Sequence, residues 1–183
     1  MDSYLNSCVK QFKYYKSLGD KAISQLEFED LSYTPSEHVN SISKIVKHIN
    51  GNMLSRWTNF LEEDGEKQWR NRDDEFVQSY KTKQELLTNW ENSWNTLFNS
   101  IEVLTNDDLN STVYIRNQGH TIIEAINRQL CHYAYHIGQV VYMAKQIKGA
   151  SFKSLSIPKG ESENFNAEKF SKAKSRRHFT DDL

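Results

Sequence analysis

Apolar residues recur at steps of three and four positions through four long stretches of the chain. This spacing places them on one side of an α-helix, and it predicts four amphipathic helices. We expect these helices at about residues 2–28, 37–61, 83–104 and 122–148. No stretch alternates convincingly between apolar and polar residues as a half-buried strand does, and only two prolines interrupt the chain. The pattern therefore predicts an all-α protein built as a four-helix bundle.

Residues with short polar side chains predict where three of these helices begin. The hydroxyl of Ser36 can accept from the free backbone N–H groups at the start of the second helix. Thr82 with Glu85, and Thr121 with Glu124, have the spacing of a capping box. We therefore expect the third and fourth helices to start at these two threonines.

The segments outside the helices differ from one another in composition. Residues 62–80 are polar and lack periodicity, which predicts a long ordered loop, and loops of that length are often functional. Residues 106–119 are expected to connect the third and fourth helices. Beyond Ser151 the apolar periodicity ends. We therefore expect residues 1–150 to form the bundle, and residues 151–183 to form an extended segment with a basic, partly mobile tail.

Composition and charge narrow the class of protein. The chain has 183 residues and a net charge of −1, so no overall field attracts nucleic acid or a membrane surface. The basic tail is better explained as solvated than as a nucleic-acid contact, because few aromatic residues alternate with its basic ones. There is no secretory signal pattern and no apolar run of about 18 residues. Together with only two cysteines, Cys8 and Cys131, this favours a soluble cytoplasmic protein without nucleic-acid or membrane partners.

Three histidines form the candidate chemistry of the chain. His132 and His136 are four residues apart, so on a helix both imidazoles lie on the same face. His48 lies beside the apolar stripe of the second helix. Neutral imidazole is a good ligand for zinc, nickel, copper or iron, and three histidines can hold an ion while leaving positions open for water or substrate.

The same three histidines also fit roles that involve no metal. The spacing matches that of metalloproteases with an HExxH motif, but Tyr133 stands where their glutamate general base would be, which argues against a protease. Two histidines four residues apart are more often packed or exposed side chains than ligands. A single histidine beside a core, such as His48, is more often hydrogen-bonded to a neighbour. In the extreme case all three are core residues and no metal binds.

Two sequence blocks carry a resemblance to a known family. The first is Ile45-Val-Lys-His48-Ile-Asn-Gly-Asn52, and the second is His132-Tyr-Ala-Tyr-His136-Ile-Gly-Gln139. Together they resemble the DinB-like family of metal-binding proteins over about residues 1–150. Further short motifs are similar to one branch of that family without an assigned function: Gly51–Trp57, Asp64–Lys67, Arg70–Asp73 and Ser156–Gly160.

The resemblance implies a fold, a metal site and a range of reactions. It implies an up-down-down-up four-helix bundle of the DinB/YfiT type, often a homodimer, with a divalent metal ion held by His48, His132 and His136. Zinc is the metal we expect, with nickel or iron as alternatives. Relatives include transferases that use a low-molecular-weight thiol such as bacillithiol or mycothiol, so we expect a thiol S-transferase or a related metal-assisted hydrolase acting on a small molecule.

Other polar residues are candidates for supporting this chemistry. Gln139 is a candidate partner for a ligand histidine, although packing explains it equally well. Arg56, Arg70 and Arg72 are candidates for binding a substrate carboxylate, because guanidinium pairs with such groups in a bidentate manner. Each arginine taken singly fits a surface salt bridge slightly better. The alternative function is a non-catalytic metal-binding or dimeric stress-related interaction protein, with loop aromatics such as Trp69 contacting a partner.

Overall fold

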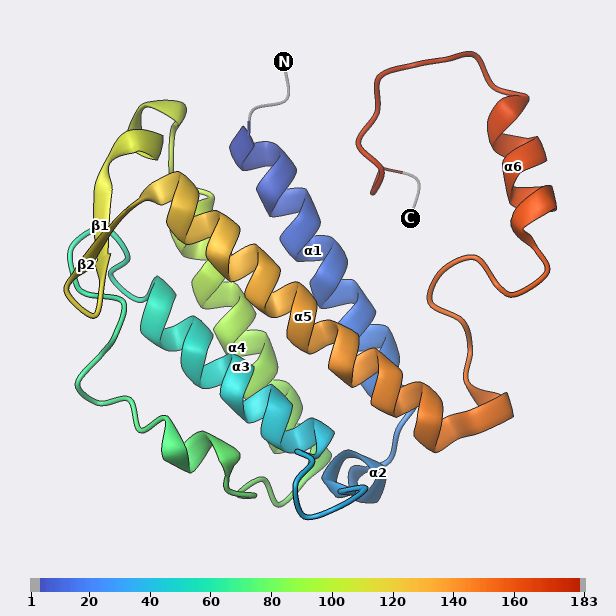
Figure 1. Ribbon diagram of the computed structural model, residues 1–183, viewed down its shortest axis with the longest axis horizontal. Coiled ribbons are helices and arrows are strands. Elements are labelled where there is room, and N and C mark those ends of the chain that lie inside the picture. The colour runs from blue at the N-terminus through green and yellow to red at the C-terminus, as the bar shows by residue number, and fades with distance from the viewer. Residues whose placement is uncertain (1–3, 182–183) are drawn as a thin grey trace.

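The computed structural model describes residues 4–181, and most of them are helical (Figure 1). Four long helices are α1 (Tyr4–Ile23), α3 (Ile42–Trp57), α4 (Lys83–Ile101) and α5 (Ile122–Lys148). The shorter elements are α2 (Phe28–Ser32), η1 (Asp73–Phe76), η2 (Asn106–Asn110), β1 (Thr112–Ile115), β2 (Gln118–Thr121), η3 (Gly149–Ser151) and α6 (Ser162–Phe170). The prediction of a mainly helical protein is therefore confirmed. No described helix is both long and apolar enough to cross a lipid bilayer.

The directions of the long helices follow from contacts near their ends. The Tyr4 hydroxyl, at the start of α1, donates to the carbonyl of Ile123 at the start of α5 over 3.3 Å. The Ser100 hydroxyl, near the end of α4, donates to the carbonyl of Trp57 at the end of α3 over 2.6 Å. Figure 1 shows α3 running toward the strands β1 and β2, and α5 running away from them. Thus α1 and α5 run one way, and α3 and α4 run the other.

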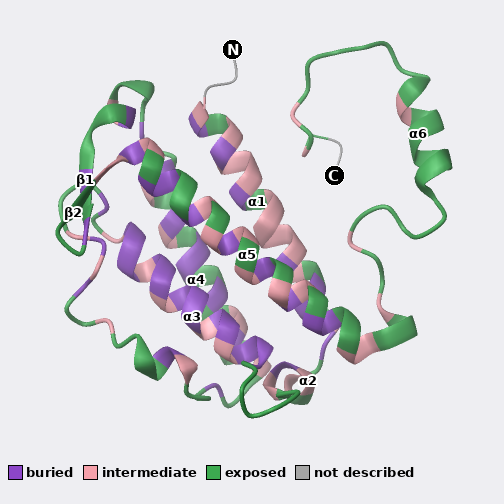
Figure 2. Ribbon diagram, viewed as in Figure 1, coloured by how far each residue is buried: buried purple, intermediate pink, exposed green. Residues whose placement is uncertain are grey.

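Aromatic side chains from all four long helices fill the interior, where Figure 2 shows the buried positions. The ring of Phe12 lies 6.1 Å from that of Trp57 and 6.0 Å from that of Tyr133, and Trp94 lies 5.9 Å from Tyr133. The Trp57 indole donates to the Tyr133 hydroxyl over 3.0 Å, and this hydroxyl donates to the Asn52 amide oxygen over 3.1 Å. These bonds satisfy the buried polar atoms of Tyr133 and tie α3 to α5.

Two of the expected helix boundaries are wrong near α3. The helix begins after Ser41, whose hydroxyl accepts from the Lys44 amide over 3.3 Å, so Ser41 and not Ser36 is its cap. The helix ends at Trp57 instead of continuing to about residue 61, and Asn59 then has a positive φ of 47°. The predicted start was too early because it was placed directly after Pro35, and the predicted end was too late because Phe60 extends the apolar pattern without being helical.

The expected first helix is also too long at its C-terminal end, whereas the other two caps are confirmed. α1 ends at Ile23, and the turn after it leads into the separate helix α2. Thr82 accepts from the Glu85 amide over 3.1 Å at the start of α4. Thr121 and Glu124 form the complete capping box that opens α5.

The segment 106–119 is more structured than expected, since it contains part of an antiparallel hairpin of β1 and β2. Arg116 and Asn117 turn the hairpin with φ values of 55° and 59°, and both backbone amides donate to the Asp64 carboxylate over 2.8 Å. The side chains of Val113 and Ile115 in β1 are buried. The expectation of no strands is therefore wrong for these eight residues.

The C-terminal region contains one helix that the sequence pattern did not predict. α6 has no buried residue, which explains the lack of an apolar stripe. After α6 the chain returns to α1, where Asp181 pairs with Lys10 over 2.7 Å and the Phe179 ring lies 5.3 Å from that of Tyr14. The end of the described chain therefore contacts the bundle (Figure 1).

Candidate metal centre

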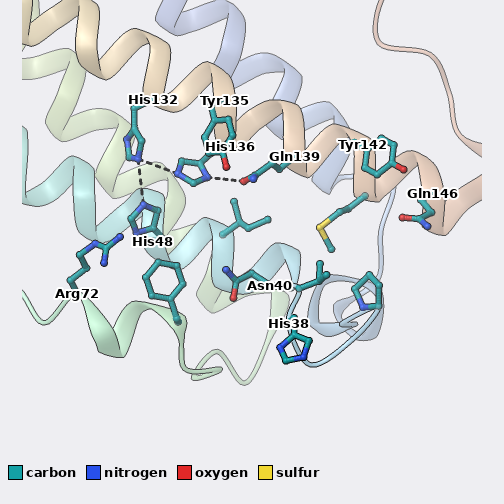
Figure 3. Close-up of a pocket in the computed structure, with 15 residues that line it drawn as sticks. His38, Asn40, His48, Arg72, His132, Tyr135, His136, Gln139, Tyr142 and Gln146 are labelled. Atoms are coloured by element: carbon teal, nitrogen blue, oxygen red, sulfur yellow. Dashed lines mark hydrogen bonds between the residues drawn. The ribbon is translucent and has the colours of Figure 1, made fainter.

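The three predicted histidines meet between α3 and α5 (Figure 3). The Nε2 atom of His132 lies 3.4 Å from Nε2 of His48 and 3.1 Å from Nε2 of His136. One ligand nitrogen from each ring lies within 4.8 Å of the other two. His132 and His136 share a face of α5, and α3 places His48 opposite them. Among the described residues this is the group that could hold a metal ion.

Hydrogen bonds behind two of the rings orient their inner nitrogens. Nδ1–H of His48 donates to Oε2 of Glu75 over 2.8 Å, and Nδ1–H of His136 donates to Oε1 of Gln139 over 2.8 Å. These bonds select the tautomer in which Nε2 keeps its lone pair, as in many histidine metal sites. Nδ1 of His132 is buried and has no hydrogen-bond partner among the described residues. Two of the three imidazoles are thus held from behind.

The spacing of the inner nitrogens fits a small divalent ion. Zinc–nitrogen bonds of about 2.0–2.1 Å in tetrahedral geometry place two ligand nitrogens about 3.3 Å apart. Two of the three separations, 3.1 and 3.4 Å, are close to that value, and the third is at most 4.8 Å. In the tautomer of His132 with its proton on Nδ1, three lone pairs face one another at this distance, and a cation between them would remove their repulsion. The donor set therefore fits a metal ion.

Electrostatics keep two of these rings in the neutral form that binds metal. Burial, together with the neighbouring His136 and His48, lowers the pKa of His132 to about 3. Burial also lowers the pKa of His136, although the hydrogen bond to Gln139 partly opposes this effect. Both imidazoles are therefore neutral at pH 7, and a metal ion does not have to displace a proton from either ring.

Glu75 is the site residue that sequence analysis missed. It lies in η1, within the loop 62–80, and its side chain is only 6% exposed. Arg70 donates to its carboxylate through Nε over 2.8 Å and through Nη2 over 3.1 Å. Burial alone would raise the pKa of Glu75, but the hydrogen bonds from His48 and Arg70 outweigh it, and the pKa is lowered. The one available signal was its place two residues after the motif Arg70–Asp73.

The three candidate arginines lie in different environments. Arg70 is bound by Glu75 and by Glu66, and its side chain is 2% exposed. Arg56 is also buried and donates to the carbonyl of Gly65 and to Glu66. Arg56 holds the loop 62–80 onto α3, and Arg70 joins two glutamates within that loop. Both arginines thus belong to a buried network and not to the surface salt bridges considered from sequence. Arg72 alone lines the large cavity.

That cavity opens directly onto the histidines and has a volume of about 690 Å³. The Arg72 guanidinium lies 5.5 Å from the ring of Phe76, which is stacked on His48 at 5.1 Å. No Asp or Glu of the described chain lines the cavity. Its remaining walls are apolar or carry neutral polar groups: Pro35, His38, Val39, Asn40, Ile45, Tyr135, Gln139, Tyr142, Met143 and Gln146.

Fold and site together define a helical protein with a candidate three-histidine metal centre at the wall of a cavity. The chain belongs to the family described as "Protein of unknown function (DUF1572)", whose model matches residues 1–161. This family lies within the DinB-like superfamily, so the broader resemblance is confirmed. Searches of the curated proteins and of the solved structures found no match.

Proposed function

We propose that this protein is a metal-dependent enzyme that transfers a low-molecular-weight thiol of the bacillithiol type to a small electrophilic substrate. The observation that carries the proposal is the position of three convergent imidazoles at the wall of a cavity of about 690 Å³. Pockets for small ligands measure roughly 300–1,000 Å³. A purely structural metal site would instead be closed by protein atoms. A metal-assisted hydrolase is the related alternative at the same site.

The metal we propose is zinc, with nickel or iron as alternatives that three imidazoles also suit. A divalent ion bound by three neutral imidazoles keeps its full charge, and it lowers the pKa of a thiol or water molecule bound beside them. His48, His132 and His136 would hold this ion. Because none of the three imidazoles carries a negative charge, these ligands do not compensate the positive charge of the ion.

The cavity residues would bind and orient the two substrates. Arg72 is a cation without an ion pair among the described residues, so it would bind a carboxylate of the thiol or of the electrophile. The apolar side chains of Ile45 and Met143 would contact the uncharged part of the ligand. In the transfer, the thiol sulfur bonds to an electrophilic carbon, the leaving group departs with its electron pair, and the thiol proton passes to solvent.

The proposal extends to topology, assembly and location. The helix directions described above support the up-down-down-up arrangement that the resemblance implies. We also propose a homodimer, because relatives form one. The unpaired thiols of Cys8 and Cys131 agree with a cytoplasmic location.

The metal centre is tested first, by elemental analysis of protein purified without an affinity tag. Wild-type protein should retain close to one equivalent of metal per chain, and His48→Ala should lose most of it, because one of three ligands is removed. Equal retention by the two proteins would contradict the site. The metal-loaded protein is then incubated with a panel of thiols and electrophiles, and thiol consumption is measured. Bound metal without turnover across the panel would argue against the transferase.

That last outcome would favour the second candidate, a non-catalytic metal-binding or dimeric interaction protein. Its support is a set of exposed aromatic side chains on the loop 62–80 and on α5. Trp69 in the loop is 60% exposed, and Tyr135 and Tyr142 on α5 are 62% and 69% exposed. Such side chains are common at protein interfaces. A change in oligomeric state on metal removal, without turnover, would support this candidate.

A further inference from the structure

A glycine on α3 provides the space in which the Glu75 carboxylate lies. Gly51 is three residues after His48, and a Cβ atom added to it would lie 2.7 Å from Cδ of Glu75 and closer still to Oε1. Real Cβ atoms do not approach another atom so closely. Glycine is a poor residue for a helix interior. Its presence in α3 is explained by the carboxylate that packs directly against the helix backbone.

The carboxylate is held there by groups from two directions. On the loop side, Arg70 binds both oxygens of Glu75, over 2.8 and 3.1 Å. On the α3 side, Nδ1–H of His48 donates to Oε2 over 2.8 Å. All three side chains are at most 6% exposed. A charge pair buried to this degree contributes little net stability, because desolvation of both charges opposes their attraction.

We propose that Glu75 is a positioning residue of the metal centre, which holds the imidazole of His48 with Nε2 facing His132 and His136. Gly51 is required for this role, since any side chain at position 51 would displace the carboxylate. The inference rests on the proposed metal site, and it assigns a function to the loop 62–80. The loop carries the orienting carboxylate to a histidine that lies on a different element.

The first test compares two carboxylates of the same loop. Zinc affinity is measured by competition with a chromophoric chelator for wild type, Glu75→Gln and Glu66→Gln. Both variants weaken ion pairs with Arg70, but only the first changes the partner of His48. Glu75→Gln should lower the affinity about 10- to 100-fold, as loss of such partners does in other metal sites. Glu66→Gln should stay within about threefold of wild type. Equal losses in the two variants would overturn the proposal.

The second test uses Gly51→Ala, which removes no charge and no hydrogen-bonding group. It should lower the zinc affinity by a factor similar to that of Glu75→Gln, although residue 51 offers no ligand. In a Glu75→Ala background the same substitution should have little further effect, because the carboxylate it displaces is absent. Unchanged affinity in Gly51→Ala, or full additivity in the double variant, would contradict the proposal. This test also serves if Glu75→Gln fails to fold.

A third measurement does not depend on metal or turnover. In the metal-free protein, nitrogen-15 NMR of the histidine side chains should place the His48 proton on Nδ1. In Glu75→Ala the proton should no longer be confined to that nitrogen, and an unchanged tautomer would overturn the proposal. Wild-type protein that binds neither zinc, nickel nor iron would refute the proposed function, whereas the tautomer would still decide whether Glu75 orients His48. Zinc binding without turnover would refute the transferase alone.

Discussion

The aromatic interior and the histidine site lie side by side between α3 and α5, yet they are built in different ways. The interior takes most of its residues from the long helices, and Phe12, Trp57 and Tyr133 are fully buried there. The histidine site also needs the loop 62–80, which supplies Glu75. The interior is mainly apolar, with a few buried side-chain hydrogen bonds such as those of Tyr133 and Asn50. The site gathers imidazoles, a carboxylate and a guanidinium.

This difference implies that residues of the interior mainly determine stability, whereas residues of the histidine site mainly determine binding. Replacing an apolar residue of the interior leaves a cavity and lowers the free energy of unfolding. Replacing a polar residue of the site changes which ions and protons bind there, with less effect on the fold. The predictions below test how far the two regions are independent.

The largest effect is expected in the interior. Phe12→Ala should lower the free energy of unfolding by about 3–5 kcal/mol, because it removes a fully buried ring that packs on Trp57 and Tyr133. Chemical denaturation of the metal-free protein measures this loss. Phe12→Leu is the matched control and should lose much less. Zinc affinity at a temperature where the variant is folded should stay unchanged, and a parallel fall in affinity would show that the regions are coupled.

The next prediction concerns pH. The pKa of His132 is about 3 in the folded metal-free protein, compared with about 6.5 when unfolded, so between these values the unfolded state binds more protons. Its contribution to stability is therefore complete above about pH 6.5 and is lost as the pH falls toward 3. For one group the slope is at most about 1.4 kcal/mol per pH unit.

Urea denaturation between pH 7 and pH 5 measures this slope above the range of most carboxylates. His132→Ala should show a smaller slope than wild type, and Phe12→Leu should show the same slope, since no titrating group is changed. Identical slopes in wild type and His132→Ala would mean that this imidazole is not kept neutral by burial.

A smaller effect is expected at the cavity wall. If a substrate carboxylate binds Arg72, Arg72→Ala should raise KM roughly tenfold with kcat nearly unchanged, because ground state and transition state lose the same contact. Steady-state kinetics with the best thiol and electrophile pair measure this, and Arg72→Lys should recover part of the loss. Metal content should match wild type. A fall in kcat alone would assign Arg72 a different role.

The smallest effect is expected at the start of α5. Thr121→Ala should lower the free energy of unfolding by about 1 kcal/mol, because the cap hydroxyl no longer accepts from the Glu124 amide. Thr82→Ala, at the equivalent place on α4, is the matched control and should lose a similar amount. Neither variant should change zinc affinity. If only Thr121→Ala changed the zinc affinity, unwinding at the start of α5 would have to extend to His132 and His136.

Periodicity and spacing predicted the parts of the site that lie on helices. His132 and His136 share a face because four residues make about one helical turn, and His48 borders the stripe of α3. The structure brings these three together as expected, and Gln139 lies behind His136 by the same rule. A periodic pattern identifies the face of a helix, and it thereby identifies which side chains can meet.

The missed features lie where no such period exists. Glu75 lies in a loop, and its carboxylate is placed beside His48 by hydrogen bonds from Arg70. No periodic pattern in the sequence indicates these contacts. The hairpin of β1 and β2 was missed because Arg116-Asn117 occupies a turn that glycine usually marks. α6 was missed because all its sides are exposed or nearly so. Ser36 was chosen as a cap because it directly follows Pro35, whereas α3 begins five residues later, after Ser41.

The Trp57 indole donates a hydrogen bond to the Tyr133 hydroxyl, which in turn donates to Asn52. These two hydrogen bonds fix the position of α5 along the axis of α3. Tyr133 directly follows His132, so these hydrogen bonds lie next to the histidine site whose alignment they maintain. A slip of one residue would move α5 by about 1.5 Å, whereas metal–ligand distances tolerate about 0.2 Å. Any force that slides the two helices would therefore disrupt the proposed metal centre long before the bundle comes apart.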